Sequence, residues 1–396
     1  MRHFSFLTNK ESSRLFHQQP ETVTISSPPE LLAVALGATL YCPGDRPNIA
    51  KDVRKQAARG CVSMVLCLED SIADSVVEYA ETNVALALRK LHEKAVEKGS
   101  HDESGLPLLF IRVRTPEQML RVAKLAGNGL SILSGFVVPK FANGDGYAQR
   151  FFDALHEIQR FDVPGADILR IMPILESPVM IHSESRSEAL AAILKVTAEN
   201  RSDVLAVRIG ATDLSSTFGL RRSRDLTVYD VKVVSSVISD IVNVFGRHSD
   251  KFVITGTVWE HYDSQERILR PQLRLTPFVE ADEAELRKKL ILTGMDGLIR
   301  EISLDQANGL LGKTVIHPSH VPVVHAMSVV SHEEYLDASA VLQDIGGGAS
   351  ASPYKNKMNE MKPHLAWAEK TVLRARAFGV AAENTTFVDL LEASMR

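Results

Sequence analysis

The sequence predicts an α/β protein that folds as a (β/α)8 TIM barrel with an N-terminal extension and a C-terminal helical segment, and three observations support this. Short apolar segments alternate with longer amphipathic ones along most of the chain. Most of the short segments are continuous apolar runs, as in parallel strands that are covered on both faces. No Gly-x-Gly-x-x-Gly motif follows the first run, which disfavours an open dinucleotide-binding sheet.

Size and composition exclude several classes of protein. The 396 residues, 45% hydrophobic and 24% charged, are enough for one barrel with additions. The net charge of −4 shows no excess of basic residues of the kind that binds nucleic acid. No apolar run is long enough to span a membrane. Three cysteines argue against a disulfide framework and fit a reducing compartment. With no secretory signal at the N-terminus, we expect a cytoplasmic protein.

Eight strands are predicted, and each ends in a turn or in polar residues. They are Ala38–Cys42, Cys61–Leu68, Leu108–Val113, Gly135–Pro139, Ile168–Leu175, Val204–Ile209, Phe252–Thr257 and Thr314–Ile316. Apolar residues at helical spacing predict helices over residues 75–98 and 229–245. The segment Gly297–Ile302 is a further strand candidate, so the register of the last βα units stays open.

The chain divides into three predicted parts. Residues 1–30 are expected to form an irregular N-terminal extension, residues 31–330 the barrel, and residues 331–396 a C-terminal helical segment. In the last part a helix precedes the run Gly346–Ser350, which is typical of a flexible connector. A second helix is predicted over His364–Phe378.

Two acids at strand ends are the candidate metal ligands. Glu176 follows the apolar run RIMPIL, and Asp213 follows VRIGAT. The C-terminal ends of barrel strands share one face, where barrel enzymes place their active sites. Two carboxylates with open positions for water and substrate suit Mg²⁺. Taken singly, each acid is equally well explained as a helix cap or a local salt bridge.

Further charged residues follow the second and third strands. Glu69 and Asp70 are interpreted as acids beside the metal, although Asp70 also fits a helix cap. Arg112 lies within an apolar strand, where an unpaired charge is costly, so it needs a partner. A substrate carboxylate gripped bidentately is one candidate, and a structural pair with Glu69 or Glu176 is the other. Arg114 is interpreted as a solvated neighbour.

The remaining candidates are less specific. Lys140 is the last residue of FVVPK and fits either a Schiff-base lysine or an electrostatic contact, of which we favour the second beside a metal. Arg46 follows the first strand, and His317 is interpreted as a packed strand-end residue. Substrate contacts are also expected at the turn before Asp213, which consists of Gly210, Ala211 and Thr212.

Seven segments in the same order resemble the citrate lyase β-subunit family, within the superfamily of 2-oxo-acid aldolases. They are LYCPGDRP, VLCLEDSIAD, FIRVRTP, FVVPK, IMPILES, RIGATDLSSTFG and GLLGKTVIHPSHVPVV. Three longer segments are more similar to the TIM-barrel C–C bond lyases associated with tellurite-resistance gene clusters. These are TGTVWEHYD, IREISLDQANGLLGKTVIHPSHV and YKNKMNEMKPHLAWAEK.

The resemblance implies a homo-trimeric or hexameric lyase that uses Mg²⁺ to make or break a C–C bond in a small 2-oxo or β-hydroxy carboxylate. The substrate would be free or carried as an acyl-CoA or acyl-carrier thioester. The matching residues are Glu176 and Asp213 for the metal, Arg112 for the substrate carboxylate, Glu69 and Asp70 for the acidic pair, and Arg46 and Lys140 for the other basic positions.

The chain departs from the family pattern at three places. Arg114 stands where the family often has asparagine, and residues 258–302 are longer and more polar than in citrate lyase β-subunits. The family's C-terminal Met-Val-Asp-type motif, whose acid in some relatives reaches a neighbouring subunit, is matched loosely by Met358-Asn359-Glu360. These departures leave the substrate open.

The proton acceptor and the reaction class have alternatives. A water on the metal, Asp70, or Glu360 from another subunit are the candidate bases. A phosphoenolpyruvate- or pyruvate-type barrel enzyme would use similar strand-end residues, but a phosphate-carrying group is not evident. The third hypothesis is a non-catalytic metal-binding subunit of a biosynthetic complex, since barrels host many functions.

Overall fold

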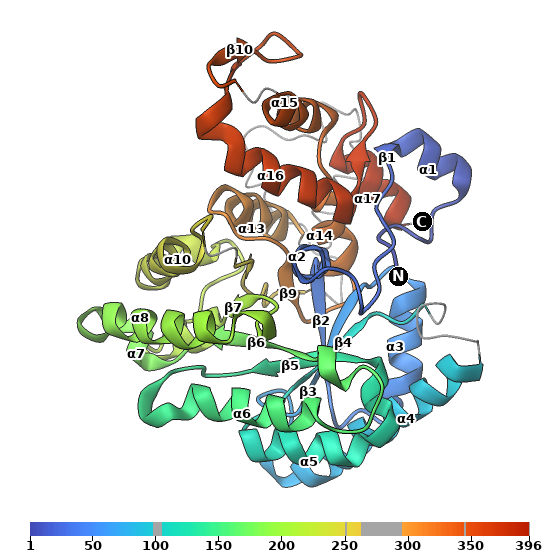
Figure 1. The fold of residues 1–396 in the computed structure, drawn as a ribbon, viewed down its shortest axis with the longest axis vertical. Helices are drawn as coiled ribbons and strands as arrows, with labels where there is room; N and C mark the ends of the chain where they lie inside the picture. The colour runs from blue at the N-terminus through green and yellow to red at the C-terminus, as the bar shows by residue number, and fades with distance from the viewer. Residues whose placement is uncertain (98–104, 250–251, 263–294, 344–345, 396) are drawn as a thin grey trace.

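A parallel sheet forms the centre of the computed structural model, which describes residues 1–97, 105–249, 252–262, 295–343 and 346–395 (Figure 1). Within these residues the sheet has eight strands in the order β8-β7-β6-β5-β4-β3-β2-β9. They are β2 (Ala38–Pro43), β3 (Ser63–Cys67), β4 (Leu108–Arg112), β5 (Leu133–Val138), β6 (Arg170–Leu175), β7 (Val207–Ile209), β8 (Ile254–Thr255) and β9 (Lys313–Val315).

The two edges of this sheet meet and close the barrel. A parallel bridge joins Gly256, directly after β8, to Lys313 in β9, and the Gly256 N–H donates to the Gly312 carbonyl over 3.1 Å. The buried Lys313 ammonium lies 2.9 Å from Glu301 Oε1 and 2.6 Å from Asp305 Oδ2, which fixes the preceding helix against the closing strand. The predicted (β/α)8 barrel is therefore confirmed.

Helices follow the strands and cover the outside of the barrel (Figure 1). They are α3 (Ile49–Ala58), α4 (Val77–Glu97), α5 (Pro116–Ala126), α6 (Tyr147–Gln159), α8 (Ser183–Glu199), α10 (Lys232–Phe245), α13 (Asp296–Ala307) and α14 (His320–Ser328). Helix α5 shows how local sequence sets the boundaries. Its N-cap Thr115 accepts from the Gln118 N–H, Pro116 occupies the first turn, and Gly127 ends the helix at φ 51°.

The structure differs from the predicted elements mainly in the second half of the barrel. Strands β7 and β8 are shorter than the apolar runs that predicted them. The alternative strand at Gly297–Ile302 is wrong, because these residues lie in α13. The buried Leu298 and Ile302 are spaced by one helical turn, and Gly297 lies so close to Trp259 that a Cβ there would be 2.5 Å from its ring.

The N-terminal segment was expected to be irregular, but it contains regular secondary structure. It contains α1 (Asn9–Leu15) and β1 (Phe16–Gln18), and β1 pairs antiparallel with β12 (Val380–Ala381) near the other end of the chain. A capping box begins α1, in which the Thr8 side chain and Glu11 satisfy each other's backbone N–H groups. This Thr-x-x-Glu signal is visible in the sequence, but a helix of seven residues shows too little periodicity to be predicted.

Helix α2 (Pro29–Ala35) closes the N-terminal end of the barrel. Its Leu31 and Leu32 belong to one apolar cluster with Val65, Phe110 and Met172, which point into the barrel from β3, β4 and β6. Burial of this face stabilises the closed end. The opposite end, where all strands have their C-termini, is therefore the end that can receive a ligand.

The C-terminal segment is more than two helices. It contains α15 (His332–Gln343), β10 (Ala349–Ala351), β11 (Met358–Glu360), α16 (Met361–Phe378) and α17 (Phe387–Met395). The predicted second helix corresponds to α16, which begins three residues earlier than expected and packs on α2 and α15. The glycine run leads into an unpredicted hairpin, β10–β11, which projects away from the barrel (Figure 1). The division of the chain at residues 30 and 330 stays a prediction, since α2 straddles the first boundary.

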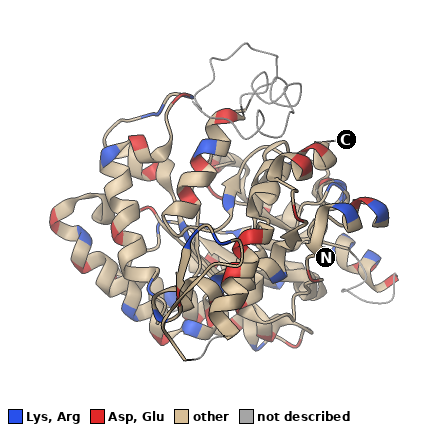
Figure 2. Cartoon of the chain, turned by 90° about the horizontal axis from the view of Figure 1, so that it is seen from above, with Lys and Arg blue, Asp and Glu red and all other residues tan. Residues whose placement is uncertain are grey.

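Charged residues of both signs are interspersed over the helices visible in Figure 2. This distribution matches the small net charge of −4 and gives this face no single-sign field that would attract a polyanion. Among the described helices, none combines the length and the apolar composition that a membrane span requires.

Buried histidines join the N-terminal segment to the barrel. The His3 ring donates through Nε2 to the Ala35 carbonyl over 2.9 Å and packs edge-on against His325, with ring centroids 4.4 Å apart. His325 Nε2 in turn accepts from the Ala38 N–H over 3.2 Å. Burial lowers the pKa of His3 to about 4 and that of His325 well below its usual value.

These histidines predict a loss of stability in acid. Above pH 6.5, the usual histidine pKa, both states of the chain leave His3 neutral. Between pH 6.5 and about 4 the unfolded chain takes up a proton that the native protein refuses, so the free energy of unfolding falls by about 3 kcal/mol from His3. Urea unfolding across this range should show a smaller pH slope for His3→Gln than for the wild type. Equal slopes would contradict the prediction.

Candidate active site

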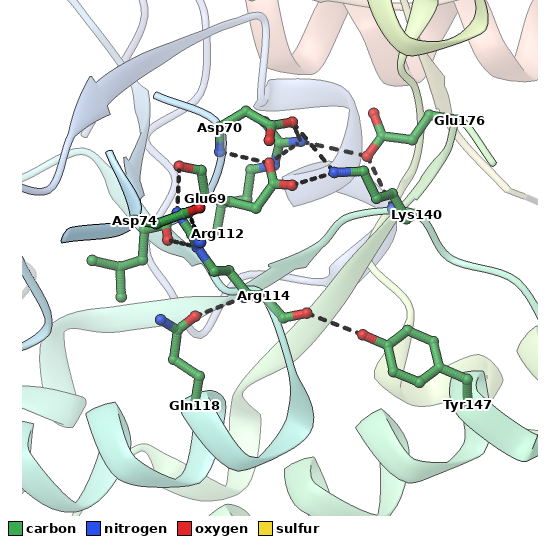
Figure 3. A network of polar contacts seen from close by, with 10 residues as sticks. Glu69, Asp70, Asp74, Arg112, Arg114, Gln118, Lys140, Tyr147 and Glu176 are labelled. Atoms are coloured by element: carbon green, nitrogen blue, oxygen red, sulfur yellow. Dashed lines mark hydrogen bonds and ion pairs between the residues drawn. The ribbon is translucent and has the colours of Figure 1, made fainter. Parts of the chain in front are cut away.

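Charged side chains from four consecutive strands meet at the C-terminal end of the barrel (Figure 3). Arg112, the last residue of β4, lies at the centre of this cluster. Its Nη2 is 2.6 Å from Glu69 Oε2 and 3.4 Å from Glu176 Oε1. Lys140, after β5, places its ammonium 2.6 Å from Glu69 Oε1. Glu69 is thus held between two cations, as the parallel register of β3, β4 and β5 allows.

Asp70 lies at the outer side of the cluster. Its Oδ2 is 3.5 Å from both Arg112 Nη2 and Lys140 Nζ, and its backbone N–H donates to Glu69 Oε2 over 2.8 Å. Burial alone would raise the pKa of Asp70, but the hydrogen bond with Glu69 and the charges of Arg112 and Lys140 lower it. Asp70 is therefore an ionised carboxylate that solvent can reach.

Lys140 has a backbone conformation that is unusual for a residue with a side chain. Its φ is 50°, in the left-handed region that favours glycine. In this conformation its N–H donates to Glu176 Oε1 over 2.9 Å while its ammonium contacts Glu69. One strained residue thus holds two carboxylates, and strain of this kind is concentrated at functional sites.

Glu176 is buried directly after β6, with its Oε1 3.4 Å from Arg112 Nη2. Burial raises its pKa to about 8; Arg112 opposes this, and the negative charge of Asp213 adds to it. Gly210 allows the close packing, because a Cβ there would lie 1.9 Å from Glu176 Oε2. Asp213 lies in the first turn of α9 (Ala211–Ser216), on the next strand's loop.

These two acids fit a hard divalent cation. Hydrogen bonds reach Glu176 only at Oε1 among the described residues, and the Asp213 carboxylate accepts none from them. Two neighbouring carboxylates repel each other unless a cation or a proton lies between them. No set of three acid, histidine or cysteine ligands occurs in the described part of the chain, so such an ion would complete its shell with water and substrate, as Mg²⁺ usually does.

Arg114 is better anchored than the sequence suggested. Its Nε donates to the Leu68 carbonyl over 2.8 Å and Nη2 to the Glu69 carbonyl over 3.4 Å, while Nη1 pairs with Asp74. Its own carbonyl accepts from Tyr147 Oη over 3.0 Å (Figure 3). Arg114 is therefore not a solvated neighbour, because its guanidinium holds the turn that carries Glu69.

Other predicted residues lie apart from the cluster. Arg46 is exposed and pairs with Asp52, 2.8 Å away, so the structure does not bring it to Arg112 or Glu176. Thr212 donates through Oγ1 to Glu260 over 2.6 Å, while Ala211 is buried. The roles predicted for Arg46 and for the turn residues stay predictions.

The structure also shows polar residues that the sequence reasoning did not select. Glu260, beside Thr212, lies in a polar loop that follows β8 and gave no strand-end signal. His317 was expected to be packed, and its ring stacks on Tyr262 with centroids 4.9 Å apart. Arg208 lies within an apolar strand just as Arg112 does, so the same argument about a buried charge would have found it.

A cavity of about 350 Å³ opens beside the cluster. It is lined by Glu69, Asp70, Asp74, Arg114, Lys140 and Tyr147, among others. Its lining is charged, and its volume is within the usual range for a small-molecule site. Fold and site together define a TIM barrel in which strand-end acids and bases lie beside a cavity of small-molecule size.

Comparison with known proteins identifies the family. The model of a family described as C–C bond lyases of the TIM-barrel fold matches residues 30–380. The chain therefore belongs to this family of TIM-barrel C–C bond lyases, as the resemblance in the sequence implied. The association with tellurite-resistance gene clusters stays a prediction. A comparison with curated proteins finds no match.

Solved structures share the fold at low identity. A citrate lyase from Burkholderia xenovorans LB400 is 15% identical, covers 90% of this chain and 96% of its own, and superposes with a TM-score of 0.58. A malate synthase from Haloferax volcanii is 14% identical over 72% of both chains, with a TM-score of 0.50. The CitE protein of Mycobacterium tuberculosis, solved with magnesium, acetoacetate and coenzyme A, is 20% identical over 87% of this chain and 99% of its own, with a TM-score of 0.45.

Proposed function

We propose that this protein is a Mg²⁺-dependent lyase that cleaves or forms a C–C bond in a small 2-oxo or β-hydroxy carboxylate. One observation carries the proposal. Arg112 lies among Glu69, Asp70 and Glu176 at the open end of the barrel, and Asp213 adds a further carboxylate beside Glu176. This arrangement offers a cation for a substrate carboxylate next to a pair of acids for a metal.

Glu176 and Asp213 are the residues that would hold Mg²⁺. When bound, the ion would act as a Lewis acid toward the substrate oxygen on which negative charge develops. Burial and, to a smaller extent, the negative charge of Asp213 raise the pKa of Glu176, and a bound cation would offset both effects. Glu69 and Asp70 would orient the site from its edge.

Arg112 would hold the substrate carboxylate. Its Nε is buried and has no hydrogen-bond partner among the described residues, whereas Nη2 is shared by three acids. A substrate carboxylate that takes the place of one of these acids on Nη2 would pair with the guanidinium and fix the orientation of the reacting carbon.

Asp70 would act as the general base, and Lys140 would stabilise the negative charge that develops on the enolate. In the cleaving direction Asp70 takes the proton of the β-hydroxyl group, the C–C bond breaks, and its electron pair becomes the enolate of the departing fragment. The Lys140 ammonium, half exposed beside the cavity, offsets this negative charge. Among the residues that the structure describes, Glu360 contacts none of the cluster within its own chain, so it would act as the base only from another subunit of a trimer or hexamer.

Removal of divalent metal tests the proposal. The protein should be assayed with a panel of β-hydroxy carboxylates and their coenzyme A thioesters, with release of the 2-oxo acid or aldehyde as the readout. We expect cleavage of at least one compound, loss of this activity in excess chelator, and recovery on addition of Mg²⁺. Full activity in chelator would contradict the assignment of Glu176 and Asp213.

A further inference from the structure

Tyr41 is a polar residue on the inner wall of the barrel that the proposed mechanism does not yet use. Along β2 the residues Leu40 and Cys42 belong to the outer core beneath the helices, whereas Tyr41 packs against the inner apolar cluster. Thr39, two residues earlier, faces inward as well, since its hydroxyl contacts Arg208. The alternation of side chains along a strand therefore places the Tyr41 ring inside the barrel.

Arg208 lies beneath this ring and is a buried cation without an acidic partner. It is 1% exposed, and in the described part of the chain it pairs with no carboxylate. It donates to Thr39 Oγ1 over 3.3 Å and to Thr314 Oγ1 over 2.5 Å, and its Cζ lies 5.8 Å from the centre of the Tyr41 ring. A buried charge that contacts hydroxyl groups, a thioether sulfur and a ring face but no carboxylate is costly, and it would be offset by negative charge that develops above it.

The strand register brings Tyr41 near the acidic and basic cluster, because it pairs with Val65, two residues before the Cys67 that pairs with Arg112. Arg112, Cys67 and Glu176 are close enough for their charges to act on the phenol. Among the described residues the hydroxyl has no hydrogen-bond partner, and it is not one of the fully buried polar atoms. It is therefore a donor that is available to a ligand.

We propose that Tyr41 donates a hydrogen bond to the substrate oxygen that gains negative charge when the C–C bond breaks, and that Arg208 positions and polarises it from below. This assignment rests on the proposed lyase function and adds a catalytic residue to it. No proton leaves Tyr41 in this step: the bonding electron pair moves onto the enolate, and the phenol keeps its hydrogen while it contacts the enolate oxygen. Donors aimed at such an oxygen are a large source of rate enhancement.

The protonation state of Tyr41 agrees with this role. Burial raises its pKa, and Arg208 and Arg112 oppose this only in part. The phenol is therefore a neutral donor at neutral pH, which is the form that can contact an oxyanion.

Tyr41→Phe removes only the hydroxyl and is the first test. With Mg²⁺ present, we expect kcat to fall about 10²-fold with little change in KM. Oxalate, a planar dianion that resembles the enolate of pyruvate, should bind about tenfold more weakly, whereas acetate should bind as in the wild type. Tyr79→Phe, at an exposed tyrosine on α4, is the matched control. Unchanged kcat and unchanged oxalate affinity in Tyr41→Phe would overturn the assignment.

Arg208 variants test the positioning role. Arg208→Gln should lower kcat as Tyr41→Phe does, and Arg208→Lys, which keeps the charge, should restore most of it. The double variant Tyr41→Phe/Arg208→Gln should be no slower than Tyr41→Phe alone, because both changes remove one interaction. Fully additive losses would overturn the coupling. A wild-type protein that binds neither oxalate nor acetate and cleaves nothing would overturn the proposed function itself, and this assignment with it.

Discussion

Glu176→Gln should abolish Mg²⁺-dependent cleavage and leave the barrel folded. The amide cannot supply the negative charge that a Mg²⁺ ion requires, and metal catalysis of this kind contributes several kcal/mol, so kcat/KM should fall about 10³-fold or more. The fold should tolerate the change. The pKa of Glu176 is already raised to about 8, and a glutamine oxygen can still accept from the Lys140 N–H. Calorimetric titration with Mg²⁺ and the cleavage assay measure the two effects.

Glu81→Gln is the matched control for this experiment. Glu81 is also a buried glutamate, but it lies on α4 and contacts Arg121 and Gln118, away from the strand ends. Its substitution should change stability modestly and leave Mg²⁺ affinity intact. If Glu176→Gln bound Mg²⁺ as tightly as the wild type, Glu176 would not be a metal ligand.

Arg112→Met should weaken both the substrate complex and the fold. The variant loses the cation that faces the substrate carboxylate, so KM should rise about 10²-fold. It also leaves Glu69 and Glu176 buried without their central partner, which should lower the free energy of unfolding by about 3 kcal/mol. Arg112→Lys should recover much of the stability but little of the affinity, because an ammonium lacks the planar fork.

Arg376→Met provides the comparison for Arg112. Arg376 makes a two-pronged ion pair with Glu21, but both side chains are well exposed and remote from the barrel opening. Its loss should cost less than about 1 kcal/mol and leave KM unchanged. Steady-state kinetics and urea unfolding of the three variants give the required numbers. A wild-type KM in Arg112→Met would rule out a carboxylate clamp.

The sequence predicted the barrel and the face of the site because both follow from strong local patterns. Continuous apolar runs marked β2 to β6 closely, and the polar residues that end these runs are brought together by the parallel register. Strands β7, β8 and β9 have only two or three residues each, so their limits depend on pairing partners far along the chain. The hairpin β10–β11 depends on tertiary packing in the same way.

Individual roles within the site were harder to predict than its location. Arg114 and Arg46 carry the same charge beside strand ends, yet one holds the Glu69 turn and the other pairs with Asp52 on α3. The difference depends on side-chain direction, which charge patterns do not reveal. Tyr41 was not predicted because a tyrosine in a strand is ordinary. Arg208 could have been selected as a charge within an apolar strand, but its contacts with Tyr41 and Thr39 become visible only in three dimensions.

A crystal structure of the protein with Mg²⁺ and a 2-oxo acid tests the central claim most directly. Crystals should be soaked in turn with oxaloacetate, pyruvate and glyoxylate. We predict an ion bound by Glu176 and Asp213, with a ligand carboxylate that bridges this ion and Arg112. A metal-free Glu176–Asp213 pair at saturating Mg²⁺, with the acids and Arg112 still paired only with one another, would contradict it.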